Sequence, residues 1–150
     1  MVDTPLNLIG EKTPRTVIYK SESHKLCQAF SVVAGKTVKQ GQPVKLSTGG
    51  LIEPYTGADG EVYLGIALTN SLTPAYAAQA NLPSEVTVMV NGFVICNWVS
   101  GAALNAGYVQ PDGTLLNDNF PKAVTSATAT NFIALNAADA ANEVVQVLIK

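Results

Sequence analysis

The chain has 150 residues, of which 47% are hydrophobic and 13% are charged, and its formal net charge is −2. A chain of this length can bury about two-thirds of its surface around one core without a metal or a disulfide. So few charged residues cannot cover the whole exterior, which favours a protein that works in an assembly rather than as a free monomer.

The sequence gives no sign of a membrane protein or of an exported one. The longest apolar runs, such as Phe93 to Cys96, are far too short to cross a bilayer. Residues 1–5 lack the basic start and the apolar block of a signal peptide. We therefore expect a soluble protein that is made in a cytoplasm and has no membrane partner.

Charge is distributed unevenly along the chain. Residues 1–45 carry seven Lys or Arg against three Asp or Glu, whereas residues 46–150 carry two against eight. A basic leading segment can dock on an acidic surface, either a neighbouring copy or a larger partner, or it can simply be a solvated end. Nucleic acid is not an expected partner, because the basic residues are spread singly and no aromatic stacking pattern accompanies them.

Residues 1–25 are predicted to form an extended N-terminal arm in front of a single domain at residues 26–150. The segment has two prolines and isolated apolar residues, so it cannot build a core of its own, yet it is too apolar for a solvated tail. Such an arm can become ordered on a partner by adding a strand to the edge of the partner's sheet.

The domain is predicted to be mainly β and to contain an internal repeat. Valines, glycines and an Ile-Ala-Leu triplet recur at similar spacings: Val33-Ala34-Gly35, Val38, Gly41 and Ile66-Ala67-Leu68 match Val99-Ser100-Gly101, Leu104, Gly107 and Ile133-Ala134-Leu135. We expect two similar glycine-marked β units, at about residues 31–96 and 97–150, packed as a small β-barrel or sandwich.

An insertion at residues 69–83 is found in the first unit alone. Thr73 followed by Pro74 is typical of a helix start, and Ala75 to Ala80 favours one short helix or helical turn. The insertion can make a contact that the second unit does not make, or it can serve as a loop over one end of the barrel.

A β-hairpin is predicted where the first unit ends. The alternating segment Glu85 to Val90 is followed by Asn91-Gly92 and then by the β-rich segment Phe93 to Val99. Asn-Gly between two β-rich runs is a strong short-range hairpin signal, because both positions of the turn need a positive φ.

Cys27 and Cys96 are the two cysteines of the chain, and neither has the spacing of a metal site. We expect both to be small buried hydrophobic residues, with a disulfide between them as the less common alternative.

Residues that could carry catalysis are few. His24 is the single histidine, and we interpret it as exposed near the arm rather than as the base of a Cys27 nucleophile. Acidic residues such as Asp59 and Asp112 precede glycines in turns, although a glycosidase pair stays open. We expect no catalytic residues, no metal and no cofactor. The tyrosines and Trp98 could line a sugar-binding face, but packing in a core or an interface is the commoner role.

The spacing pattern resembles that of the capsid decoration, or cement, proteins of tailed bacteriophages. The matching elements are Val32 to Val44, Gly50 to Ile52, Leu64 to Leu68, Glu85 to Gly92 and Val99 to Leu115. The resemblance implies a barrel-like body, usually trimeric, on the outside of the mature head, where it staples neighbouring major capsid proteins. It also implies that the protein is a structural component of the virion and not an enzyme.

The arm and the insertion depart from this pattern, so other attachments stay open. The protein could be the capsid-bound base of a head fibre, a carbohydrate-binding or host-adhesion module, or a small hydrolase. For the decoration role we expect the contact residues to be Leu6, Leu8, Ile9, Arg15 and Tyr19 in the arm and Tyr76 in the insertion.

Overall fold

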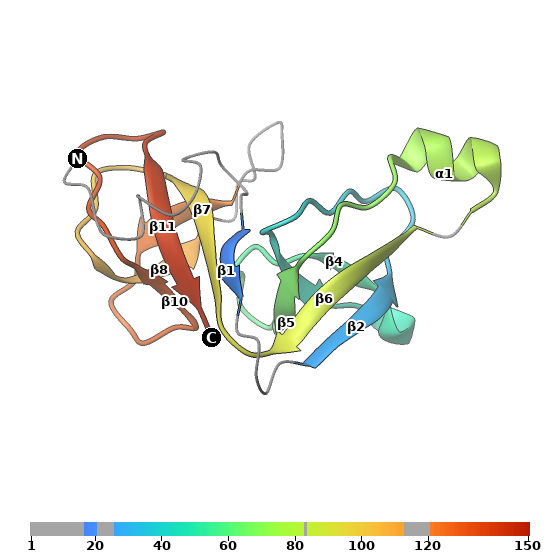
Figure 1. Cartoon of the computed structure of the whole chain (residues 1–150), viewed down its shortest axis with the longest axis horizontal. Helices are drawn as coiled ribbons and strands as arrows, with labels where there is room; N and C mark the ends of the chain where they lie inside the picture. Colours follow the sequence, from blue (N-terminus) through green and yellow to red (C-terminus); the bar gives the residue numbers. More distant parts are fainter. Residues whose placement is uncertain (1–16, 21–25, 83, 113–120) are drawn as a thin grey trace.

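The computed structural model describes residues 17–20, 26–82, 84–112 and 121–150, which form two β-sheets and one α-helix (Figure 1). The predicted fold class, a mainly β protein with one short helix, is confirmed. Apart from residues 17–20, which join the sheet of the second unit, each sheet is built from consecutive strands, so that residues 26–91 form a first unit and residues 94–149 form a second unit.

The first unit contains five strands in the order β2-β6-β5-β3-β4. The chain order is β2 (Leu26–Ser31), β3 (Pro43–Leu46), β4 (Ile52–Pro54), β5 (Val62–Ala67) and β6 (Glu85–Asn91), with a 3-10 turn at Thr48–Gly50. The helix α1 (Pro74–Ala80) lies between β5 and β6.

The second unit repeats this arrangement strand for strand. Its strands are β7 (Val94–Ser100), β8 (Gly107–Pro111), β9 (Lys122–Thr125), β10 (Phe132–Ala134) and β11 (Val144–Ile149), in the order β7-β11-β10-β8-β9. Each strand of the first unit therefore has a counterpart five strands later, in the same place in the sheet. The predicted pair of similar units is thus confirmed in the topology itself.

The registers of the two units also correspond. Ala67 pairs with Val88 in the first unit, and Ala134 pairs with Val147 in the second. The Ile-Ala-Leu triplets that the sequence matched are therefore structural equivalents.

Both units are closed at the same point. A parallel pairing of Ser100 with Ala123 joins β7 to β9 and closes the second unit into a barrel. In the first unit the corresponding residues are Val32 and Ile52, and an isolated parallel bridge joins them. The first unit is therefore closed by a single residue pair.

Buried side chains occupy equivalent places in the two interiors. In the first unit they are Val38, Val44, Ile52, Ala67, Val86 and Val88, and in the second they are Leu104, Val109, Ala123, Ala134, Val145 and Val147. The glycines between them permit tight turns, as at Gly35 and Gly60, whose φ angles are +79° and +83°.

The two units are joined by a shared apolar contact. Ile66 and Met89 are cross-strand partners of the first unit, and both are buried in the core cluster of the second. The indole Nε1 of Trp98 donates a buried hydrogen bond of 3.1 Å to the carbonyl oxygen of Gly41 in the first unit. Phe132 packs 5.2 Å from Tyr63, measured between ring centroids. The units therefore form one continuous body.

The hairpin predicted around Asn91-Gly92 is wrong. The chain does turn there, and Gly92 has a φ of 130°, but β6 pairs with β2 and β5 whereas β7 pairs with β1, β9 and β11. The turn is the connection between the two units. An Asn-Gly turn determines only the local path of the chain, and the partners of each strand are set by the sheet to which it belongs.

Most of the predicted arm, residues 1–16 and 21–25, lies outside the described residues. The remaining four residues form strand β1 (Val17–Lys20), which pairs antiparallel with β7 of the same chain. In this segment the prediction of a strand on a partner's sheet is therefore corrected: the strand is added to the chain's own second unit, because β7 presents an edge at Val94–Cys96 that can accept one.

The prediction that both cysteines are buried holds for one of them. Cys96 is fully buried, Cys27 is exposed on β2, and the two thiols are free. Cys27 lies on β2 at the place that corresponds to Ile95 of β7, not to Cys96, so the two cysteines occupy different positions in the two strands. Cys96 belongs to the buried core cluster of the second unit.

Candidate functional site

The insertion of the first unit is the feature that most clearly distinguishes the two halves. α1 stands away from the sheet at one end of the molecule (Figure 1). At the corresponding place in the second unit, β10 and β11 are joined by residues 135–143 without a helix. A segment that the duplicated fold does not need is a candidate for a contact with another molecule.

The local sequence explains why a helix forms here. Thr73 is the N-cap, its side chain accepts a hydrogen bond of 3.4 Å from the Tyr76 backbone N–H, and Pro74 occupies the first turn. Asn81 ends the helix in the left-handed conformation, with a φ of 51°. The prediction of a helix that starts after Thr73 is therefore confirmed.

The base of the insertion is firmly attached to the sheet, although the helix itself is not. Ser71 and Val38 exchange two hydrogen bonds of 2.8 and 2.9 Å, and the Leu72 backbone N–H donates to Ser84 Oγ at 3.0 Å. The helix has seven residues and none of them is buried. An isolated helix this short is unstable in water, so its position depends on these contacts at its base.

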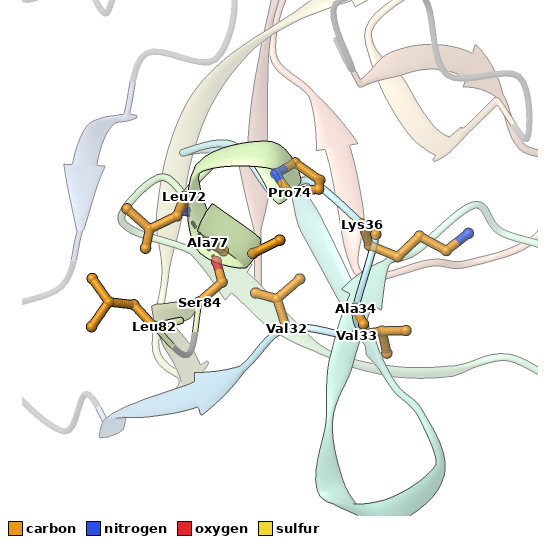
Figure 2. A pocket seen from close by; sticks show the side chains of 11 residues that line it. Val32, Val33, Ala34, Lys36, Leu72, Pro74, Ala77, Leu82 and Ser84 are labelled. Atoms are coloured by element: carbon orange, nitrogen blue, oxygen red, sulfur yellow. Dashed lines mark hydrogen bonds between the residues drawn. The ribbon is translucent and has the colours of Figure 1, made fainter. Parts of the chain in front are cut away.

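An apolar groove of about 300 Å³ lies between α1 and the end of the first unit. Figure 2 shows Ala77 on the helix facing Val32 of the sheet, with Leu72 and Leu82 at one end and Lys36 extending away at the other. We call this hollow the α1 groove. Its wall carries Lys36 as a charged residue and is otherwise lined by small or aliphatic residues and Ser84.

The outer face of the insertion is also apolar. α1 contains no charged residue, and two large side chains beside the groove are half exposed: Tyr76 at 54% and Leu82 at 50%. Apolar area of this kind, around a groove and on a firmly attached base, is typical of a surface that binds another protein.

A cluster of charged residues on β3–β5 and the loop after β4 has a structural role. Lys45 Nζ lies 2.5 Å from Glu61 and 3.5 Å from Glu53, and Glu61 also accepts hydrogen bonds from Thr56 and from the Gly57 backbone N–H. These contacts tie the loop that follows β4 to the sheet.

The protonation of Glu61 follows from these contacts. Burial raises its pKa, but the hydrogen bonds from Lys45 and Thr56 outweigh burial and leave the pKa below its usual value. The hydrogen bond to Glu61 is also the main reason why the pKa of Lys45 is raised. Both groups are therefore held in their charged forms, so Glu61 is not poised to act as a general acid at neutral pH.

Three of the six aromatic residues considered for a sugar-binding face, Trp98, Tyr55 and Tyr63, pack against one another or against Phe132, whereas Tyr76 and Tyr108 are exposed. Trp98 is fully buried and lies 5.2 Å from Phe132, and Tyr55 and Tyr63 pack against the same ring. Burial is the main cause of the raised pKa of Tyr63. These rings form the contact between the two units and are not available as a platform for a sugar.

The predicted contact residues are distributed as follows. Leu6, Leu8, Ile9 and Arg15 lie outside the described residues, as does His24. Tyr19 lies in β1, where its backbone pairs with Ile95. Tyr76 is exposed on α1, beside the groove.

Sequence reasoning missed several exposed apolar residues. Leu82 belongs to the insertion, and Leu26 and Phe93 are exposed at 57% and 50% near the connection between the units. Leu46 and Val62 form an exposed cross-strand pair at the end of β3 and β5. In the sequence Leu26, Leu46, Val62 and Phe93 look like core residues of β-rich segments, and only the sheet order shows which face or edge each occupies.

The described part of the chain contains no group of three or more His, Cys, Asp or Glu side chains arranged to hold a metal ion. Within the same residues, no helix has both the length and the apolar character needed to span a bilayer. No protein-family model matches the chain, and no curated protein is significantly similar to it in sequence.

Proposed function

We propose that the chain is a structural protein of a tailed-bacteriophage virion that binds the outside of the head and stabilises contacts between major capsid proteins. The proposal rests on the resemblance of its glycine and valine spacing to capsid decoration proteins. The observation that carries it is the insertion: an uncharged, outward-standing helix with no buried residue, above an apolar groove.

The α1 groove is the surface that we assign to the capsid. A groove of about 300 Å³ can receive one or two side chains of a partner, while Tyr76 and Leu82 add apolar area around it. Aromatic and aliphatic anchors of this kind dominate the binding energy of many protein interfaces. Because a capsid presents many identical sites, a modest contact per copy is enough to decorate the whole head.

The rest of the molecule fits a structural role, in which the protein binds a partner by the shape of its surface and catalyses no reaction. The two units share a core and pack as one body, and the hydrogen bonds of Ser71 and Ser84 attach the base of the insertion to it. The proposed protein has no catalytic step and needs no cofactor. The base of a head fibre would use the same capsid contact, and it differs only in carrying a further protein.

The test is retention on undecorated heads. Purified protein is mixed with heads that lack it, and bound protein is measured after gradient sedimentation. We expect the wild type to co-sediment with the heads, and the double variant Tyr76→Ala/Leu82→Ala to lose at least tenfold in apparent affinity, because each truncated anchor contributes about 1 kcal/mol or more.

The matched control is Tyr108→Ala, which removes an exposed tyrosine from β8 of the second unit. It should bind heads like the wild type. All variants should keep the wild-type unfolding midpoint, because the altered side chains are exposed. Equal binding of the double variant and the wild type would reject the α1 groove as the contact, and a wild type that never co-sediments would reject the capsid role.

A further inference from the structure

β2 holds the place in the first unit that β7 holds in the second. The pairing of Phe30 with Val86 corresponds to the pairing of Trp98 with Val145, and the same offset relates Cys27–Ser31 to Ile95–Val99; beyond Cys27 the pairing of β2 with β6 shifts by one residue. By this offset, Leu26, Cys27 and Gln28 of β2 are the counterparts of Val94, Ile95 and Cys96 of β7.

The two strands differ in what lies on their outer edge. Val94, Ile95 and Cys96 are paired with Lys20, Tyr19 and Val17 of β1. Among the described residues no strand pairs with the outer edge of β2 before its bridge at Val32, and residues 26–29 are all exposed. Within the part of the chain that the structure describes, the first unit therefore has an unpaired edge at the place where the second unit carries the antiparallel strand β1.

This edge also lacks the features that usually prevent edge-to-edge pairing. Free edges are commonly protected by charged side chains or proline. The opposite edge of the same sheet, β4, has both features, since it carries Glu53 and ends at Pro54. The edge strand of the other sheet, β1, ends at the charged residue Lys20. β2 has the sequence LCQAFS, without a charge or a proline, and it exposes 57% of Leu26.

We propose that the outer edge of β2 is a homotypic docking surface, on which β2 of a second copy lies antiparallel and continues the sheet across a twofold axis. A second copy is the occupant that fits, because an uncharged edge can pair with itself without placing like charges opposite each other. The proposal stands on the first unit alone and does not depend on the capsid role.

The counterpart pairing fixes the register. β1 covers the three residues of β7 that correspond to Leu26–Gln28, and Cys27 is the middle one. A twofold axis at Cys27 sets Leu26 of each copy against Gln28 of the other and brings the two Cys27 residues directly opposite. Opposed residues in antiparallel strands have Cβ atoms about 4.5–5.5 Å apart, close to the separation that a disulfide requires.

The exposed thiol of Cys27 gives a direct test. The reduced protein is first sized by sedimentation over a concentration series, and is then treated with a mild oxidant and analysed without reductant. We expect a reversible dimer in the reduced state, and an oxidised dimer that reductant separates. Cys96 will not form this link, because it is fully buried and burial raises the pKa of its thiol.

Three variants separate this edge from other contacts. Cys27→Ser should abolish the covalent link and keep the reversible dimer. Cys27→Lys should give a monomer, because it sets two positive charges opposite each other. The matched control Val62→Lys, at a residue that is 59% exposed on β5, should remain dimeric.

Several results would overturn the proposal. The first is a wild-type protein that stays monomeric at every concentration and forms no disulfide through Cys27. The second is a dimer that persists in the Cys27→Lys variant. The third is a trimer, the state that the resemblance to decoration proteins implies. Binding of heads by a monomeric Cys27→Lys variant would leave the capsid role intact, so the two proposals can fail separately.

Discussion

Replacement of Phe132 by alanine should destabilise both units together. Phe132 belongs to β10 of the second unit and is 3% exposed. Its ring centroid lies 5.2 Å from that of Trp98 in the same unit, and 5.2 and 6.2 Å from those of Tyr63 and Tyr55 in the first unit. The ring is therefore packed between the two halves of the molecule.

The size of the effect follows from this packing. Truncation of a buried phenylalanine to alanine costs about 3–5 kcal/mol, as lost burial and a residual cavity. Folded proteins of ordinary size are stable by about 5–15 kcal/mol. The Phe132→Ala variant should therefore lose a large fraction of the free energy of unfolding and still be folded under mild conditions.

Urea unfolding provides the assay, because Trp98 is the single tryptophan and is in contact with the altered ring. Trp98 fluorescence reports on the contact between the two units, because its indole is hydrogen-bonded to Gly41 of the first unit, and circular dichroism reports on both sheets. We expect the two signals to give one coincident transition that moves to lower urea. The control Tyr108→Ala, at a residue that is 43% exposed, should change stability by no more than about 0.5 kcal/mol.

Two results would refute this reasoning. A loss of less than about 1 kcal/mol in Phe132→Ala would mean that the ring is not packed as described. Separate transitions in the wild type, one in fluorescence and another in circular dichroism, would mean that the two units unfold independently and do not share a core.

Three further predictions concern charge and backbone. Because the pKa of Glu61 is lowered in the folded protein, its carboxylate stabilises the fold at pH values above 4.5, and this stabilisation is lost as the pH falls through the lowered pKa. The Glu61→Gln variant should therefore be less stable than the wild type at neutral pH and should lose less stability in acid, measured as unfolding midpoints from pH 7 to pH 2. The raised pKa of Tyr63 means that the unfolded chain loses this proton first, so stability should fall as the pH rises above 10.0. The Tyr63→Phe variant should show a smaller fall, measured as unfolding midpoints at pH values below and above 10.0. The Gly65→Ala variant should lose more thermal stability than Gly60→Ala, because a Cβ at Gly65 would collide with the Met89 carbonyl oxygen. At Gly60 the positive φ alone should lower the free energy of unfolding by about 1–2 kcal/mol. Equal losses of stability in the two variants would contradict this.

The duplicated architecture was accessible from the sequence because its signals are local and repeated. Val38 and Leu104 occupy the same place in the two units, and so do the triplets that begin at Ile66 and Ile133. Spacing of apolar residues and glycines is preserved because each unit must fill its own interior. The start of α1 was predictable for a similar reason, since capping by Thr73 and Pro74 involves neighbouring residues.

Features that depend on strand partners were not accessible in the same way. Asn91-Gly92 marks a turn, but nothing in those residues shows that β6 and β7 join different sheets. Cys27 is exposed and Cys96 is buried because they occupy different positions in two equivalent strands: Cys27 corresponds to Ile95, whereas Cys96 packs in the core of the second unit. The α1 groove was missed because Val32 looks like an ordinary core residue, and its place in the groove depends on the path of an insertion about forty residues away in the sequence.

The stability of the head itself tests the proposed role most directly. Undecorated heads filled with DNA are heated with and without the purified protein, and the temperature at which they release DNA is recorded with a dye that binds exposed DNA. A protein that staples neighbouring capsid proteins raises this temperature, and the Tyr76→Ala/Leu82→Ala variant raises it less at equal concentration. Heads that bind the protein and release DNA at an unchanged temperature would contradict a stabilising function.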